Sequence, residues 1–215
     1  MSEAKVVAKP AILSLWSDWA NLCTLLGVVS GMLGIYFAVA GQFAIAAAMG
    51  VIAVILDCFD GPIARRTANR APHMSAVGLQ LDSLADVICS GVGPAVLVLA
   101  VGGWHPLYLV PAILLVVAGV TRLAYFNVFG LSGGKFSGFP IFYNPVIIAI
   151  VLLVLLLLDR SLAAIGLAIA GVVVAVLNVA PIQIPKLAGR FFTFFVVGSF
   201  ALTAALLIVA FTEAS

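Results

Sequence analysis

Apolar segments of about 20 residues follow one another along almost the whole chain, and a helix needs about that many to cross a bilayer. Of the 215 residues, 65% are hydrophobic and only 8% are charged, whereas about a quarter are charged in a soluble domain. The pattern therefore predicts an all-α fold, a polytopic bundle of membrane helices. Because the apolar content is spread evenly, we expect one integral membrane domain over residues 1–215.

Seven spans can be delimited, and the first six predict a six-helix core over residues 21–179. The spans cover residues 21–40, 42–66, 77–101, 106–127, 141–158, 161–179 and, as an additional helix, 190–211. Before them, Ile12, Leu15, Trp16 and Trp19 recur at helical spacing. They predict an interfacial helix over residues 9–19 with its tryptophans at headgroup depth, although a substrate gate is an alternative. We expect no cleavable leader.

Lysines and arginines gather on one side of the predicted bundle. If the N-terminus is inside, that side carries Lys5, Lys9, Arg65, Arg66, Arg70, Arg122, Lys135, Lys186 and Arg190, and only Arg160 lies outside. This asymmetry predicts a multi-pass protein of the cytoplasmic membrane, with the 66–77 loop in the cytoplasm and the C-terminus outside. The net charge of +2 gives no indication of a nucleic-acid partner.

Four of the eight acidic residues lie near the cytoplasmic ends of the second and third spans. Asp57 and Asp60 are three residues apart, and Asp82 and Asp86 are four apart, so each pair shares a helix face. In the third span Gly78 begins this row, and Ser90 and Pro94 continue it. Ionisable residues at membrane depth are costly and indicate function.

Small residues and an arginine accompany these carboxylates. Gly61 and Ala64 follow Asp57 and Asp60 by one turn and leave space beside them, and Arg65 edges the same face. Carboxylate oxygens without histidine or cysteine favour Mg²⁺, Mn²⁺ or Ca²⁺ over zinc. Metal, arginine and glycine together are typical of a pyrophosphate site, whereas the plain structural alternative is pairing of the aspartates with nearby arginines.

These eight positions resemble the signature of the CDP-alcohol phosphotransferase (phosphatidyltransferase) family. The signature has two parts here, D-x-x-D-G-x-x-A-R over residues 57–65 and G-x-x-x-D-x-x-x-D over residues 78–86. The interval 66–77 is longer than is usual in the family, which predicts an extended cytoplasmic loop within residues 67–76. The resemblance implies a six-helix core, a homodimer and two divalent cations, Mg²⁺ or Mn²⁺.

The resemblance also implies residue roles. Asp57, Asp60, Asp82 and Asp86 would hold metal, and Asp86 would also be the general base. The CDP group would be bordered by Asp60, Gly61, Ala64, Arg65 and Gly78. The implied reaction moves the phosphatidyl group of CDP-diacylglycerol, or of an ether-lipid analogue, to a small alcohol and releases CMP, with the site facing the cytoplasm.

Flanking segments are similar to the phosphatidylserine synthase branch of the family, which implies serine as the acceptor. They are NLCT (21–24), LDSLAD (81–86), GVGPA (91–95), RLAYFN (122–127) and FSGFP (136–140). Two departures are Tyr125, where the branch often has arginine, and Phe142-Tyr-Asn144, where it has small residues.

Arg122, Asn127 and Lys135 are candidate acceptor contacts, since the two cations suit the carboxylate of serine. Arg122 is alternatively a positive-inside anchor, and Asn127 a helix cap. Glycerol phosphate, inositol, inositol phosphate and choline remain alternative acceptors. A cation transporter is the rival from another class, but acids clustered at one face, rather than at the midplane, argue against it.

Overall fold

The computed structural model describes residues 11–68 and 70–214, the last two of them by backbone only. Lys5, Lys9 and the first two residues of the expected 9–19 helix lie outside the described residues. From residue 12 the segment forms a six-residue 3-10 helix, η1 (Ile12–Ser17), rather than a longer helix through Trp19. Its apolar side chains Leu13 and Trp16 are exposed, as an interfacial segment requires.

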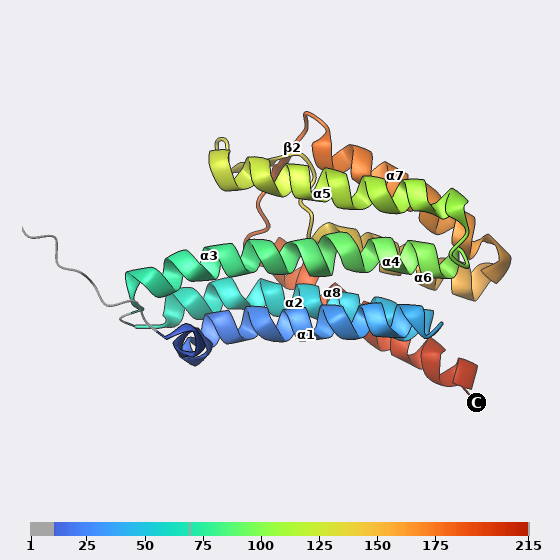
Figure 1. The fold of residues 1–215 in the computed structure, drawn as a ribbon, viewed down its shortest axis with the longest axis horizontal. Coiled ribbons are helices and arrows are strands. Elements are labelled where there is room, and N and C mark those ends of the chain that lie inside the picture. Colours follow the sequence, from blue (N-terminus) through green and yellow to red (C-terminus); the bar gives the residue numbers. More distant parts are fainter. Residues whose placement is uncertain (1–10, 69, 215) are drawn as a thin grey trace, which may run out of the picture.

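Long helices run side by side along one axis of the molecule (Figure 1). They are α1 (Trp19–Val39), α2 (Phe43–Arg66), α3 (Pro72–Asp86) continued by α4 (Gly93–Val101), α5 (Leu109–Phe129), α6 (Tyr143–Leu158), α7 (Ala163–Val179) and α8 (Gly189–Ala214). Short 3-10 helices, η3 (Pro106–Tyr108) and η4 (Arg160–Leu162), precede α5 and α7. In the described part of the chain, six passes are long and apolar enough to span a membrane, and the 16-residue α6 is a shorter apolar helix. The predicted all-α, polytopic membrane fold is confirmed.

Helix α2 lies at the centre of the bundle and packs against α1, α6 and α8, while α5 pairs with α7 (Figure 1). Small side chains permit this close approach, because backbones in a membrane associate through tight packing. A Cβ placed on Gly34 of α1 would lie only 3.1 Å from the Ala46 carbonyl oxygen of α2. The facing stretch of α2 is buried alanine at residues 46–48.

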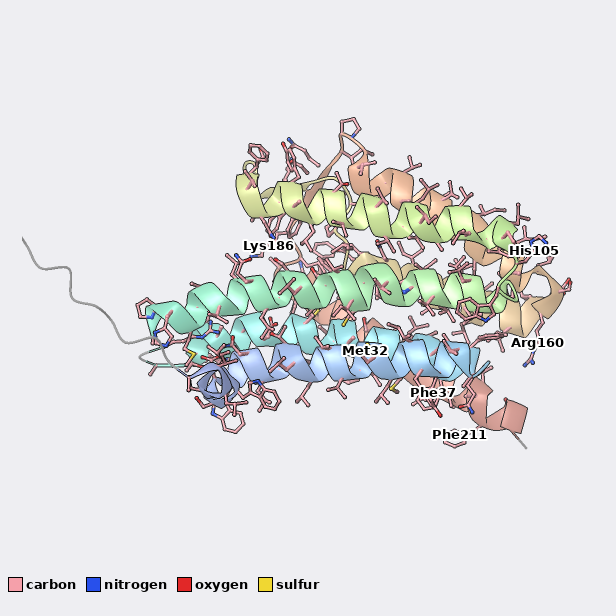
Figure 2. All side chains as sticks on the ribbon, viewed as in Figure 1. Met32, Phe37, His105, Arg160, Lys186 and Phe211 are labelled. Atoms are coloured by element: carbon pink, nitrogen blue, oxygen red, sulfur yellow. The ribbon has the colours of Figure 1, made fainter. Side chains whose placement is uncertain are left out.

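Large apolar side chains cover the outside of the helices (Figure 2). Met32 is 51% exposed and Phe211 is 75% exposed. Such a surface suits lipid, because the hydrocarbon of a bilayer solvates apolar side chains as water cannot. The same view places Arg160 and His105 together at one end of the bundle, away from Lys186.

The third pass is not a continuous α-helix. A π-helix, η2 (Val87–Val92), separates α3 from α4. The side chains of Asp86 and Ser90 hydrogen-bond, so the expected Asp82–Asp86 row extends to Ser90, and the wider turn of the π-helix changes the helical spacing beyond it. Pro94 also has no N–H for the carbonyl of Ser90, and that carbonyl accepts a hydrogen bond of 3.2 Å from the side-chain amide of Asn144 instead.

The connection between α2 and α3 is shorter than the sequence predicts. Only Thr67–Ala71 separate the two helices, because α3 begins at Pro72 and residues 72–77 form its first turns. Proline suits the first turn of a helix, where its missing N–H has no partner to lose. Half of the long interval before Gly78 is therefore helix, and the expectation of a long loop over residues 67–76 was wrong.

Two short strands were not expected from the sequence. β1 (Lys135–Ser137) follows α5, β2 (Gln183–Pro185) follows α7, and they pair antiparallel with Phe136 opposite Ile184. Lys135 therefore lies in a strand rather than in an irregular glycine-rich loop. The small sheet joins the α5–α6 and α7–α8 connections at one end of the bundle.

Candidate active site

Three of the four aspartates converge between α2 and α3. Among the described residues, Asp57, Asp60 and Asp82 each offer a carboxylate oxygen within 4.8 Å of the other two. All three side chains are half-buried. At an effective dielectric constant of about 20, two ionised carboxylates at this distance repel by roughly 3 kcal/mol, so the group calls for a cation.

A divalent ion fits this oxygen set. Mg²⁺ binds oxygens at about 2.0–2.1 Å in octahedral geometry, so opposite ligands lie about 4.2 Å apart, close to the spread of these three oxygens. In the described part of the chain, the basic side chains do not take the place of an ion, because Arg70 forms its salt bridge with Asp18 instead. The residues present thus suit a hard cation.

Asp86 lies outside that triad, one turn further along α3. Asp57 and Asp86 line a small cavity of about 10 Å³, together with Thr24 of α1 and Ser90 of the π-helix. A cavity of that size holds about one water molecule. Asp86 also interacts electrostatically with Arg122 of α5. Asp86 therefore shares a cavity with Asp57, but its contact with Arg122 distinguishes it from Asp60 and Asp82.

A cleft of about 220 Å³ opens beside the triad and runs toward the α2–α3 connection. Its walls include four of the five positions expected to border CDP, namely Asp60, Gly61, Ala64 and Gly78. Thr24 also lines it and donates a hydrogen bond of 2.6 Å to Asp60 Oδ2. The spacing in the sequence thus brings these small residues to one concave surface.

Arg65 does not line the cleft. Its side chain is exposed and lies over Gly61, where an added Cβ would be 3.3 Å from Arg65 Nη1. Arg70 and Asn21 line the cleft instead, and both contact the space above Gly78. The NLCT segment contained Asn21 and Thr24, and Arg70 was predicted only as a cytoplasmic-side cation and a possible partner of the aspartates, not as a residue of the CDP site.

A second polar site lies between α5, α7 and the strands. A cavity of about 420 Å³ is lined by Arg122 and Tyr125 of α5, by Gly138, and by residues 178–183. Arg122 is 5% exposed, and its Nε and Nη2 atoms have no hydrogen-bond partner among the described residues. The guanidinium carbon lies 5.2 Å and 5.1 Å from the ring centroids of Phe126 and Phe136. The protein thus leaves the donors on two nitrogen atoms of this buried cation unpaired within the described residues.

The family model of the CDP-alcohol phosphatidyltransferases matches residues 18–213, which include both sites. The chain belongs to this family. Divalent-cation dependence is general among CDP-alcohol phosphatidyltransferases, and the triad of Asp57, Asp60 and Asp82 provides a place for the ion.

Named relatives share this family. The chain is 32% identical over 170 residues to the archaetidylserine synthase of Methanothermobacter thermautotrophicus, covering 79% of this chain and 70% of that protein. It is 34% identical over 134 residues to a CDP-diacylglycerol–serine O-phosphatidyltransferase of Helicobacter pylori, covering 60% of this chain and 55% of that protein. An enzyme of that name from Methanocaldococcus jannaschii is 29% identical over 176 residues, covering 81% and 77%.

The other two candidate acceptor contacts of this CDP-alcohol phosphatidyltransferase do not line the Arg122 cavity. Asn127 faces α3, where its Nδ2 donates a hydrogen bond of 2.9 Å to Ser83 Oγ. It therefore ties α5 to the metal-site helix rather than capping a helix end. Lys135 is exposed in β1. Tyr125, at the position where the branch often has arginine, does line the cavity.

A buried amide pair connects the two sites. The side chains of Asn144 and Asn178 exchange two hydrogen bonds of 3.2 Å, and both are almost fully buried. Asn144 also donates to the Ser90 carbonyl after Asp86, and Asn178 donates to the Phe139 carbonyl at 3.0 Å. Gly138 fits here because a Cβ would collide with the Asn178 carbonyl. The pair thus fixes the loop beside Arg122 to the helix that carries Asp86.

Proposed function

We propose that this protein transfers the phosphatidyl group of CDP-diacylglycerol, or of an ether-lipid analogue, to L-serine, giving the phosphatidylserine-type lipid and CMP. The observation that carries the choice of serine is the buried Arg122, which lines a cavity of about 420 Å³ and whose Nε and Nη2 atoms have no hydrogen-bond partner among the described residues. A carboxylate matches the fork of a guanidinium. The names of the relatives from three organisms support the same acceptor.

In this proposal the acidic cleft holds the nucleotide. Asp57, Asp60, Asp82 and Asp86 would hold the metal, and Asp60, Gly61, Ala64 and Gly78 would border the CDP group, with Arg65 outside the cleft wall beside Gly61. When bound there, two divalent ions, Mg²⁺ or Mn²⁺, would neutralise charge on the pyrophosphate and on the departing CMP. The half-buried setting strengthens this effect, because screening by water is weaker there than at the surface.

The acceptor approaches from the Arg122 side. Arg122 binds the serine carboxylate and orients the serine hydroxyl toward Asp86. Arg122 and Asp86 interact electrostatically in the structure. Asp86 accepts the hydroxyl proton, the serine oxygen forms a bond to the lipid-side phosphorus, and the bond from that phosphorus to the CMP oxygen breaks. Holding both reactants in one geometry supplies much of the rate.

The site faces the cytoplasm in this proposal, and the protein lies in the cytoplasmic membrane. Support comes from the placement of Arg65, Arg66, Lys186 and Arg190 near helix ends on the side of the α2–α3 connection, with Arg160 on the other side. Positive residues concentrate on the cytoplasmic side of membrane proteins. The homodimer implied by the family resemblance stays a prediction.

An acceptor screen tests the function. Purified protein would be incubated with CDP-diacylglycerol and Mn²⁺ or Mg²⁺, and with serine, glycerol phosphate, inositol, inositol phosphate or choline in turn. Of these five acceptors, only serine is expected to give CMP release. Release with another acceptor but not with serine would move the assignment within the family, and release with none would refute the proposed reaction.

A further inference from the structure

The interval between the two halves of the family signature brings an additional arginine into the nucleotide cleft. Arg70 lies in the Thr67–Ala71 connection, outside the signature itself. It lines the 220 Å³ cleft together with Asp60, Gly78 and Asp82. The signature's own Arg65 is exposed and absent from the cleft wall, so Arg70 is the guanidinium that reaches this surface among the described residues.

Arg70 is held firmly by α1. Its Nε donates to Asp18 Oδ2 at 2.7 Å, and its Nη2 donates to Asp18 Oδ1 at 3.0 Å and to Asn21 Oδ1 at 2.9 Å. Asp18 is fixed in turn, because its carboxylate caps α1 by accepting from the Asn21 backbone N–H. Such a two-point contact fixes the plane of the guanidinium as well as its position.

These contacts leave one edge of the guanidinium unused. A guanidinium has five N–H donors, and those on Nη1 take no partner from the protein within residues 11–68 and 70–214. Gly78 is what lets the group reach the cleft wall, since a Cβ there would lie 2.8 Å from Arg70 Nη2 and 2.7 Å from Asn21 Oδ1. Gly78 therefore admits Arg70 to the cleft.

The position of Gly78 indicates which part of a ligand Arg70 meets. Gly78 precedes Asp82 by four residues, which corresponds to about 6 Å along a helix axis. Ala64 follows Asp60 by four residues on the facing helix, in the same direction. A pyrophosphate at the aspartates would therefore place the next part of the nucleotide, its CMP half, beside Gly78, Ala64 and Arg70.

We propose that Arg70 is a substrate-binding residue whose Nη1 donors contact acceptor oxygens of the CMP half of the CDP-lipid, with Asp18 and Asn21 holding the guanidinium in place. The inference rests on the proposed function. It assigns to the connection between α2 and α3 a direct part in binding the nucleotide.

Binding of CMP in the presence of Mn²⁺, measured by calorimetry on the full chain in detergent, tests this assignment. Loss of a hydrogen bond from a charged donor corresponds to about a tenfold loss of affinity or more. R70Q is therefore expected to raise the Kd for CMP at least tenfold, and R70K to raise it less. The matched control is R66Q, which removes an exposed arginine from the end of α2 and is expected to leave the Kd within twofold of wild type.

Two further readouts separate the possible failures. Binding of Mn²⁺ alone, followed by electron paramagnetic resonance, is expected to be the same in R70Q as in wild type, which also shows that the variant is folded. If wild type binds CMP and R70Q binds it equally well, the role of Arg70 is refuted while the proposed function stands. If wild-type protein does not bind CMP with Mn²⁺ at all, the proposed function itself fails.

Discussion

The acidic cleft and the Arg122 cavity are opposites in charge and in the way the chain builds them. At the cleft, carboxylate oxygens of Asp57, Asp60 and Asp82 lie within 4.8 Å of one another, and the arginine in its wall, Arg70, forms its salt bridge with Asp18. The cavity is lined by Arg122, two of whose nitrogen atoms have no hydrogen-bond partner, and no acidic residue lines it in the part of the chain that the structure describes. Each site is incomplete without a ligand of opposite charge, and together they suit a metal-bound nucleotide and a carboxylate-bearing alcohol.

The largest effect is expected at the triad. Asp57→Asn removes one of the three carboxylate charges of the triad, and we expect CMP release to fall about 1000-fold or more, since metal stabilisation contributes several kcal/mol. Mn²⁺ binding by electron paramagnetic resonance should weaken in parallel. Asp159→Asn, at the far end of the bundle, is the control, and unchanged Mn²⁺ binding in the Asp57 variant would contradict the metal assignment.

Asp86 should behave differently from the triad if it acts as the base. We expect Asp86→Asn to lower CMP release about 100- to 1000-fold, the usual contribution of a positioned base. CMP binding in the presence of Mn²⁺ should stay within a few-fold of wild type. Turnover close to wild type in this variant would remove Asp86 from the mechanism.

On the cavity side, Arg122→Gln should raise the KM for serine about 10- to 100-fold, because a charge-assisted contact to the carboxylate is lost. The KM for CDP-diacylglycerol should not change. Lys135→Gln offers a matched control, since that cation is exposed in β1 and does not line the cavity. Equal effects of the two substitutions on the KM for serine would argue against Arg122 as the carboxylate contact.

Substitutions in the Asn144–Asn178 pair, which joins the two regions, should have a smaller effect, and that effect should be on stability. Asn144→Ala and Asn178→Ala are each expected to lower stability by about 1 kcal/mol, in the range found for polar contacts between membrane helices. Because the two amides bond to each other, the double variant should lose less than the two losses added together. Thermal unfolding in detergent measures all three variants, and strict additivity would contradict the contact.

The smallest expected effect concerns pH and Asp18, which lies before the first membrane span. Burial raises the pKa of Asp18, but the hydrogen bonds from Arg70 and the Asn21 N–H outweigh burial and hold the pKa below its ordinary value of 3.8. A lowered pKa stabilises the fold above 3.8, and this contribution disappears as the pH falls through the folded-state pKa. Wild type should therefore have a higher free energy of unfolding than Asp18→Asn. This difference should stay constant above pH 5 and become smaller below pH 3.8. A constant difference down to pH 3 would contradict the ion pair.

The acidic cleft could be predicted from the sequence more completely than the Arg122 cavity. The acidic site comes from two consecutive helices, so helical spacing alone brought Asp57, Asp60, Gly78 and Asp82 together in the prediction. The seven apolar helices were also predictable from their continuous apolar segments, although α6, with 16 residues, is shorter than the other six passes. Local periodicity was sufficient for both.

The second site depends on contacts between distant parts of the chain. Arg122 was identified as a candidate from its charge, but its burial between Phe126 and Phe136 requires β1 to pair with β2, nearly 50 residues further on. Strands of three residues are too short to show an alternating pattern. The π-helix after Asp86 and the Asn144–Asn178 pair were missed for the same reason, since each depends on a partner in another helix.

Incorporation of radiolabelled serine into lipid, with CMP measured in the same reaction, tests the account most directly. Wild-type protein with CDP-diacylglycerol and Mn²⁺ or Mg²⁺ is expected to form one labelled phosphatidylserine for each CMP released, and a chelator should stop both products together. Label that never enters lipid while another alcohol supports CMP release, or a reaction that continues at full rate with chelator, would contradict it.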